Sequence, residues 1–142
     1  MQIIDKEIIL KLKQEFTPLK SIFKKFIQDN NLNNANLVCW VPHEVSSIVQ
    51  IGWEEGLLED LKDFLNEVCP SEKYKNHDEP NTVFRYNAHE HIQTKLIGDI
   101  SKTFIVKDGE LYIGKYQDLY FYSPVWQSIP NQKIFCRILK FD

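Results

Sequence analysis

The chain has little glycine, little proline and no excess of positive charge. Its 142 residues include 5 glycines and 6 prolines, which is too few for a disordered or fibrous protein. The 17 basic and 20 acidic residues leave a formal net charge of −3, and the basic residues form no block. Because nucleic-acid binding depends on a basic patch or stripe, we expect no nucleic-acid partner.

A long apolar run and a cysteine motif are also missing. The N-terminal segment MQIIDKEIILKLKQEF is interrupted by charged residues from Asp5 onward, so it predicts neither a signal peptide nor a membrane span. Cys39, Cys69 and Cys136 lie far apart, without a CxxC pair. An odd number of isolated cysteines indicates reduced, buried thiols. We therefore predict a cytoplasmic protein that does not bind membranes.

The residues that are present suffice for one packed domain. Hydrophobic residues make up 43% of the chain and aromatic residues 13%, with no internal repeat and no linker. A chain of this length is typical of one domain with an ordinary core. We therefore predict a single domain over residues 1–142.

Strands are predicted where apolar residues alternate with polar ones or form short runs. These segments are EIILKLKQ (7–14), NLVCWVP (36–42), the hairpin KTFIVKDGELYIG (102–114), QDLYFYSPVW (117–126) and KIFCRILKF (133–141). Asp108-Gly109 is the expected hairpin turn. The last two strands carry apolar residues on both faces, which indicates a central position in a sheet or a contact between subunits.

Three helices are predicted from apolar spacing. The first has Thr17 as its N-cap and Pro18 as its first residue. The second has an apolar face between Leu57 and Val68 and is followed by a polar loop, PSEKYKNHDEPN. The third lies in NAHEHIQTKLIGD, where Ile92 and Leu96 share a face and Gly98 ends the helix. The fold class is therefore α+β, with mainly antiparallel sheet and about three helices.

The four histidines stand out among the candidate functional residues. His43 follows a predicted strand, His77 lies in the polar loop, and His89 and His91 open the third helix. Each lies in a loop or at the end of an element, where side chains can converge on a cleft. Two interpretations remain open: a metal or phosphate site, or histidines scattered on the surface.

The spacing His89-Glu90-His91 has a direct geometric consequence. In a strand the two rings project to the same side, whereas in a helix they point about 200° apart. Both can bind one ion only if the helix begins after His91. Three neutral imidazoles suit Zn²⁺ and leave a fourth position for water or substrate.

Several segments together resemble a known family. They are VPH after an apolar strand, a helix ending in LNEVCP, then YKNHDEP, HEHIQTKLIGD and FIVKDGELYIGKYQDLYF. In order and spacing this chain resembles the YjbQ family across nearly its whole length. All four histidines fall on or beside histidines of the family pattern. The other matching positions are Gly98, Asp108, Gly109, Gly114, Gln117 and Tyr120.

The resemblance implies an α+β protein that assembles as a homotrimer, with a histidine-lined site near a subunit boundary. It also implies that the histidines bind a divalent metal or an anion. Members of the family are called secondary thiamine-phosphate synthases, so a weak activity of that kind is implied as well.

The chain departs from the family pattern at several positions. Glu44 replaces the threonine after the first histidine, and QIGWEEG replaces an acidic and amide-rich segment. Gln93 replaces a lysine, although Lys95 lies two residues further on. Lys115-Tyr116-Gln117-Asp118 stands where the family has TWQG. These departures affect the chemistry of the site more than the fold.

Two functional hypotheses follow. The first is a metal-assisted enzyme that acts on a small phosphorylated molecule, with a divalent ion such as zinc as its cofactor. Its expected residues are His43, His89 and His91 as metal ligands, His77 and Glu44 as catalytic groups, and Lys95 and Gln117 as substrate-binding groups. The second is a homotrimer that binds a metal, an anion or a metabolite without turning it over. If Glu44 or Glu54 points into the histidine cluster, catalysis stays open; if both face solvent, the binding protein is favoured.

Overall fold

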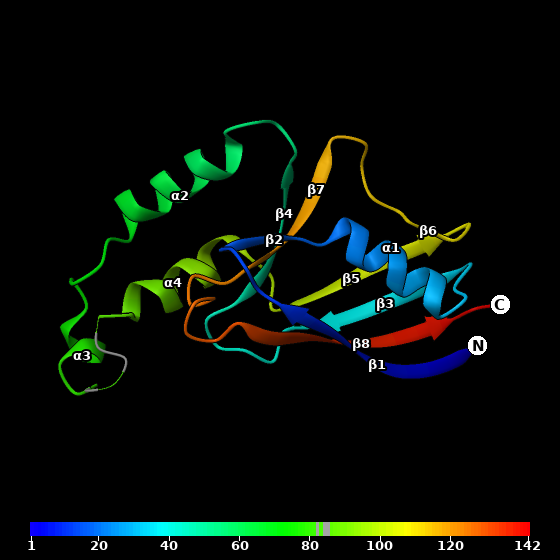
Figure 1. Ribbon diagram of the computed structural model, residues 1–142, viewed down its shortest axis with the longest axis horizontal. Helices are drawn as coiled ribbons and strands as arrows, with labels where there is room; N and C mark the ends of the chain where they lie inside the picture. The colour runs from blue at the N-terminus through cyan, green and yellow to red at the C-terminus, as the bar shows by residue number, and fades with distance from the viewer. Residues whose placement is uncertain (82, 84–85) are drawn as a thin grey trace.

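The computed structural model describes residues 1–81, 83 and 86–142 (Figure 1). In chain order the elements are β1 (Gln2–Lys11), β2 (Phe16–Pro18), α1 (Lys20–Asp29), β3 (Ala35–Trp40), β4 (Ser47–Gly52), α2 (Leu57–Val68), α3 (Lys75–Asp78), α4 (Ala88–Ile97), β5 (Ser101–Lys107), β6 (Glu110–Leu111), β7 (Gln117–Tyr122) and β8 (Asn131–Lys140). The predicted α+β class is confirmed.

The strands form two antiparallel sheets. The larger has the order β1-β8-β3-β5-β6, and the smaller has the order β2-β7-β4. β8 lies between β1 and β3, and β7 lies between β2 and β4. The central positions predicted for the last two long strands are therefore confirmed.

The main core lies between the larger sheet, helix α1 and strand β7. Alternate residues of the long strands point into it, and α1 contributes Phe23 and Ile27, both buried. The ring of Phe23 lies 5.0 Å from that of Phe104 on β5, measured between centroids. The hairpin turn also agrees with the prediction, because Asp108 and Gly109 have φ values of 54° and 80°, as a tight two-residue turn requires.

Two local predictions were wrong or incomplete. Thr17 and Pro18 belong to β2, where they pair with β7, and α1 begins only at Lys20 without a side-chain cap. Tertiary pairing thus overrides a local capping signal. The segment after His43 forms a strand, β4, that was not predicted, and the polar loop contains the short helix α3.

Helix α4 buries two polar residues, Gln93 and Thr94, together with Ala88. Ile92 and Leu96 share a face as predicted, but they are 39% and 57% exposed, whereas Gln93 and Thr94 are fully buried. Gln93 Nε2 donates to the carbonyl of Cys69 at 2.9 Å, and its Oε1 accepts from Lys62 Nζ at 2.9 Å. Gln93 thereby joins α4 to α2.

Two further expectations concern the cysteines and the membrane. Cys39, Cys69 and Cys136 are free and buried, as predicted. In the part of the chain that the structure describes, no helix is long and apolar enough to cross a membrane.

Candidate functional site

Helix α4 sets the directions of the HEH residues. The helix begins at Ala88, so His89 and His91 both lie within it. Glu90 and His91 follow Asn87 by three and four positions, so both lie on the face of the helix that carries Asn87. His89 lies away from this face. The extended geometry needed for His89 and His91 to hold one ion is not formed in this chain.

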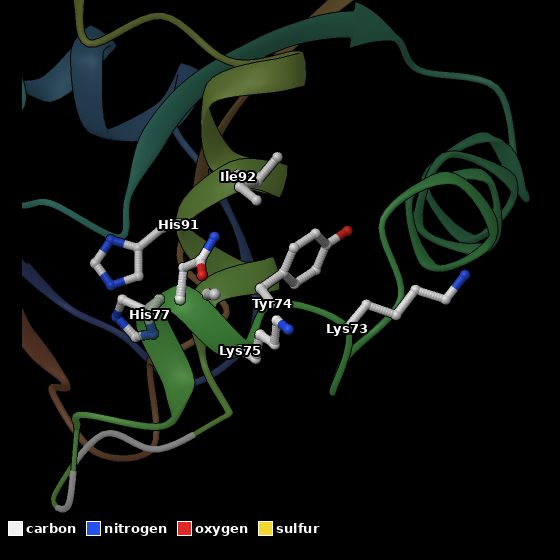
Figure 2. Close-up of a pocket in the computed structure, with 8 residues that line it drawn as sticks. Lys73, Tyr74, Lys75, His77, His91 and Ile92 are labelled. Atoms are coloured by element: carbon white, nitrogen blue, oxygen red, sulfur yellow. The ribbon is translucent and has the colours of Figure 1, made fainter.

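His91 meets a histidine from another element. Its ring lies 5.2 Å from that of His77 on α3, measured between centroids, at an interplanar angle of 55°. Figure 2 shows the two rings side by side, one from each helix. This His77–His91 pair is the centre of the candidate site.

Asp78 orients His77. Its Oδ1 lies 2.7 Å from His77 Nδ1 and also accepts from the backbone N–H of Ala88 at 3.3 Å. Burial by itself would raise the pKa of Asp78, but the hydrogen bonds from His77 and Ala88 and the nearby imidazoles hold it below its ordinary value. The carboxylate therefore fixes His77 and ties α3 to the first turn of α4, leaving His77 Nε2 available for a ligand.

Glu44 approaches the pair from the loop between β3 and β4. Its Oε1 lies 3.4 Å from His91 Nδ1 and 3.8 Å from Lys95 Nζ, and Lys95 also donates to the Glu44 carbonyl. Glu54 lies on the exposed approach to α2. The side chain of Glu44 is 71% exposed, but it contacts His91, so the criterion set by the sequence leaves catalysis open.

Two hollows meet at the His77–His91 pair. The first, here called the basic hollow, has a volume of about 480 Å³ and is lined by Lys73, Lys75 and Asn76 as well as the pair. In Figure 2, Lys73 extends on the side far from the rings. A hollow of this volume is large enough for a small metabolite.

The second hollow, here called the acidic hollow, has a volume of about 620 Å³. Its carboxylates are Glu44 and Glu90, its amides include Asn81, Asn87 and Gln127, and its apolar wall includes Val45, Val125 and Ile129. Burial raises the pKa of Glu90, although the positive charge of Lys62 opposes the shift.

The other two histidines lie outside this pair. His43 Nε2 accepts from the backbone N–H of Lys133 at 2.9 Å, so this ring nitrogen carries no proton. Burial and the charge of Lys133 lower the pKa of His43, and burial and the charge of Lys62 lower that of His89. Both effects favour neutral rings.

The predicted metal ligands are therefore not brought together. His43 is engaged with β8, His89 lies on another face of α4 than His91, and only His91 belongs to the pair. Within the described residues no group of three His, Cys, Asp or Glu side chains could hold a metal ion. These donors do not fit a single three-histidine site within one chain.

Gln117 is also remote from the pair. It opens β7, opposite Gly52, and its Oε1 accepts from the backbone N–H of Gly114 at 2.9 Å. Sequence reasoning missed Asp78 and Glu90 as site residues. The spacing of Asn87, Glu90 and His91 could have indicated a shared helix face, had the helix been placed to begin at Ala88.

Comparisons with known proteins agree on one family. The family model described as "UPF0047 protein YjbQ-like" matches residues 6–140. A UPF0047 protein of Archaeoglobus fulgidus is 31% identical over 85 residues, which cover 60% of this chain and 64% of that protein. A UPF0047 protein of Methanocaldococcus jannaschii is 24% identical over 110 residues, 77% of this chain and 75% of that protein.

Solved structures show the same fold. A hypothetical protein of Aeropyrum pernix K1 has a TM-score of 0.77 at 21% identity, covering 97% of this chain and 99% of that chain. A protein of Sulfolobus solfataricus P2, described as YbjQ-like and of unknown function, has a TM-score of 0.75 at 21% identity, covering 99% of both chains.

Proposed function

The chain belongs to the family of UPF0047 YjbQ-like proteins, and we propose that it binds a small phosphorylated molecule at the His77–His91 pair and acts on it by acid–base chemistry. The observation that carries this proposal is the convergence of His77, fixed by Asp78, with His91 in a hollow that Lys75 also lines. The phosphate group would occupy the basic hollow.

The lining of the basic hollow supports phosphate binding. Lys75 provides positive charge, and the amide of Asn76 and the imidazoles provide N–H donors, while Lys73 extends on the side of the hollow far from the rings. A phosphate accepts several charge-assisted hydrogen bonds, each stronger than a neutral one. The hollow is open to solvent beside two short helices, so a small ester can enter without a change of fold.

His77 is the proposed catalytic residue. The hydrogen bond with Asp78 at Nδ1 places the reactive nitrogen, Nε2, on the side of the ring away from the carboxylate. In the hydrolysis of a phosphate ester, water attacks phosphorus, the bond from phosphorus to the leaving oxygen breaks, and protonated His77 donates its Nε2 proton to that oxygen. Asp78 stabilises the imidazolium before this transfer, and the proton of the attacking water passes to solvent. Glu44 makes a longer and more exposed contact with His91, 3.4 Å from its Oε1 to Nδ1.

A resident metal is not part of this mechanism. The three histidines expected to bind a divalent ion do not converge, and the pair alone offers two imidazoles. We derive no step through a metal. The thiamine-phosphate synthase activity implied by the family resemblance stays a prediction.

Binding without turnover is the second candidate. It is favoured by Glu44, which stands at a position where the family has threonine and whose carboxylate is engaged by His91 and Lys95. A carboxylate in this position would repel a phosphate placed directly against it. The two candidates share the ligand class and differ only in whether phosphate is released.

We also propose that the chain self-associates, with the homotrimer of the family as the expected form. The supporting observation is the outer face of the larger sheet, opposite to the face covered by α1. Four apolar side chains on this face are strongly exposed: Ile3 at 60%, Ile9 at 71%, Trp40 at 49% and Ile105 at 49%. A symmetric copy is the usual cover for such a face. Light scattering on the wild type and on a Trp40→Lys/Ile105→Lys variant should give a trimer and a monomer respectively; a monomeric wild type would contradict the proposal.

Calorimetric titration with ethyl phosphate and inorganic phosphate tests the binding function. The wild type should bind ethyl phosphate, and Lys75→Gln and His91→Ala should weaken binding about tenfold or more, because each removes a charge-assisted contact. Lys6→Gln, an exposed lysine on β1, is the matched control and should bind as the wild type does. If the wild type binds neither ethyl phosphate nor inorganic phosphate, the proposal is refuted.

Phosphate release from phenyl phosphate separates the two candidates. If His77 is the proton donor, His77→Asn should bind the ester but release phosphate about 10²- to 10⁴-fold more slowly than the wild type. Binding by the wild type without any phosphate release from a panel of esters would favour the non-catalytic candidate.

A further inference from the structure

We propose that the phosphorylated ligand also carries a basic amine, and that its ammonium group binds beside Glu90 and Asn87 in the acidic hollow. The inference rests on the proposed function, because it assumes that the phosphate lies in the basic hollow. It names the ligand class as an aminoalkyl phosphate, a molecule with an anion at one end and a cation at the other.

The charges of the two hollows are opposite. On one side of the His77–His91 pair the ionised side chains of the lining are Lys73 and Lys75, and on the other they are Glu44 and Glu90. Among the described residues that line the acidic hollow there is no lysine or arginine. A single ligand that spans the pair would therefore meet positive charge at one end and negative charge at the other.

The nearby lysines already have partners. Lys62 forms an ion pair with Glu15 at 2.7 Å, and Lys95 lies 3.8 Å from Glu44. The side chain of Glu90 is 24% exposed, and its closest ion-pair partner is the Nε2 of His89 at 3.9 Å. Since His89 is held towards its neutral form, Glu90 lacks a strong cationic partner within the described chain.

The raised pKa of Glu90 supports the same conclusion. Burial disfavours its ionised form more strongly than the charge of Lys62 favours it. A ligand ammonium placed at this carboxylate would supply the missing positive charge. The ammonium group would thereby favour the ionised form of Glu90 and oppose the rise in its pKa.

Asn87 offers a second acceptor on the same helix face. It precedes Glu90 by three residues and also lines the acidic hollow. Its Oδ1 is buried and has no hydrogen-bond partner in the part of the chain that the structure describes. An ammonium group has three N–H donors, so it can satisfy this oxygen and Glu90 together.

The size and the apolar wall accommodate the carbon chain between the two charged ends. The acidic hollow, of about 620 Å³, lies in the range of small-molecule sites. Val45, Val125 and Ile129 form its apolar part and can contact methylene groups. A neutral alkyl phosphate would bury the same carbons but leave Glu90 and Asn87 without a donor.

The test compares matched pairs of ligands on the wild-type protein by calorimetry. Each aminoalkyl phosphate with two to five carbons is titrated beside the alkyl phosphate of equal length. At the best length the amine should bind about ten- to a hundredfold more tightly, because the contact is a hydrogen-bonded ion pair in a partly buried site. Glu90→Gln should abolish this preference, whereas Glu55→Gln, an exposed carboxylate before α2, should keep it.

The outcomes separate this inference from the function on which it rests. Equal affinity for the two ligands of every pair, measured on the wild type, would overturn the amine and leave phosphate binding intact. A preference that persists in Glu90→Gln would overturn the assigned contact. If neither the ligands of a pair nor inorganic phosphate bind, the proposed function itself fails, and the inference fails with it.

Discussion

Polar residues one turn apart on helix α4 are used in different ways. Next to α2, Gln93 is fully buried and its amide is hydrogen-bonded to backbone and side-chain partners. Earlier in the helix, Asn87 and Glu90 line the acidic hollow and have no comparable partners among the described residues. A buried polar group that is satisfied holds the fold together, whereas one that is not satisfied is poised to accept a ligand. The following experiments test this difference, in order of decreasing expected effect.

The largest loss of stability is expected at Gly98, which ends helix α4. A Cβ on Gly98 would overlap the Cβ and Oγ of Ser47, which is itself fully buried on β4. Gly98→Ala should therefore destabilise the fold by about 3 kcal/mol, measured by urea unfolding. The double variant Ser47→Gly/Gly98→Ala removes the Ser47 side chain that the new Cβ would overlap, so it should recover most of the lost stability. No recovery would show that the overlap is not the cause.

The next test removes the satisfied polar group. Gln93→Leu removes one acceptor of Lys62, which keeps Glu15 and Tyr122, and leaves the carbonyl of Cys69 without its donor, so the free energy of unfolding should fall by about 2 kcal/mol. Gln28→Leu, an exposed glutamine on α1, is the control and should change stability by less than about 0.5 kcal/mol. Equal effects of the two substitutions would contradict the structural role of Gln93.

A third test uses pH. The pKa of His43 in the folded protein lies below its ordinary value because of burial and the charge of Lys133, and that of His89 is also lowered. Unfolding therefore raises both pKa values, so the unfolded state binds more protons and stability falls as pH drops below about 6.5. His43→Gln should reduce this slope in unfolding curves measured between pH 7 and pH 5. An unchanged slope in both His43→Gln and His89→Gln would contradict the assignment.

The smallest effect on stability is expected for a substitution in the basic hollow. Lys75→Gln changes an exposed residue of α3, so its free energy of unfolding should stay within about 0.5 kcal/mol of the wild-type value. The same substitution should weaken phosphate binding. A loss of stability comparable to that of Gln93→Leu would instead make Lys75 a structural residue.

The sequence predicts elements better than it predicts their contacts. The alternation in β1, the apolar spacing of α2 and the Asp108-Gly109 turn are local signals, and the strand, the helix and the turn that they predict are confirmed. Thr17-Pro18 and the strand β4 failed as predictions because pairing with β7 decides both. A pairing partner more than sixty residues away leaves no signal in a local window.

The candidate site could be predicted only in part. His77 and His91 were recognised individually, but their meeting depends on Asp78, which links α3 to the first turn of α4. His43 and His89 have the same residue type and similar positions at the ends of elements, yet they face other surroundings. Residue type predicts what a side chain can do, whereas the start of a helix decides which side chains point to the same place.

The dual use of α4 also limits how its length can vary. Each residue turns a helix by about 100°, so one inserted or deleted residue between Glu90 and Gln93 would rotate one of these side chains away from its partners. Restoring both registers together takes an insertion of about three or four residues, close to one full turn. The spacing between Glu90, which lines the acidic hollow, and Gln93, which joins α4 to α2, is therefore as constrained as the identity of the two residues.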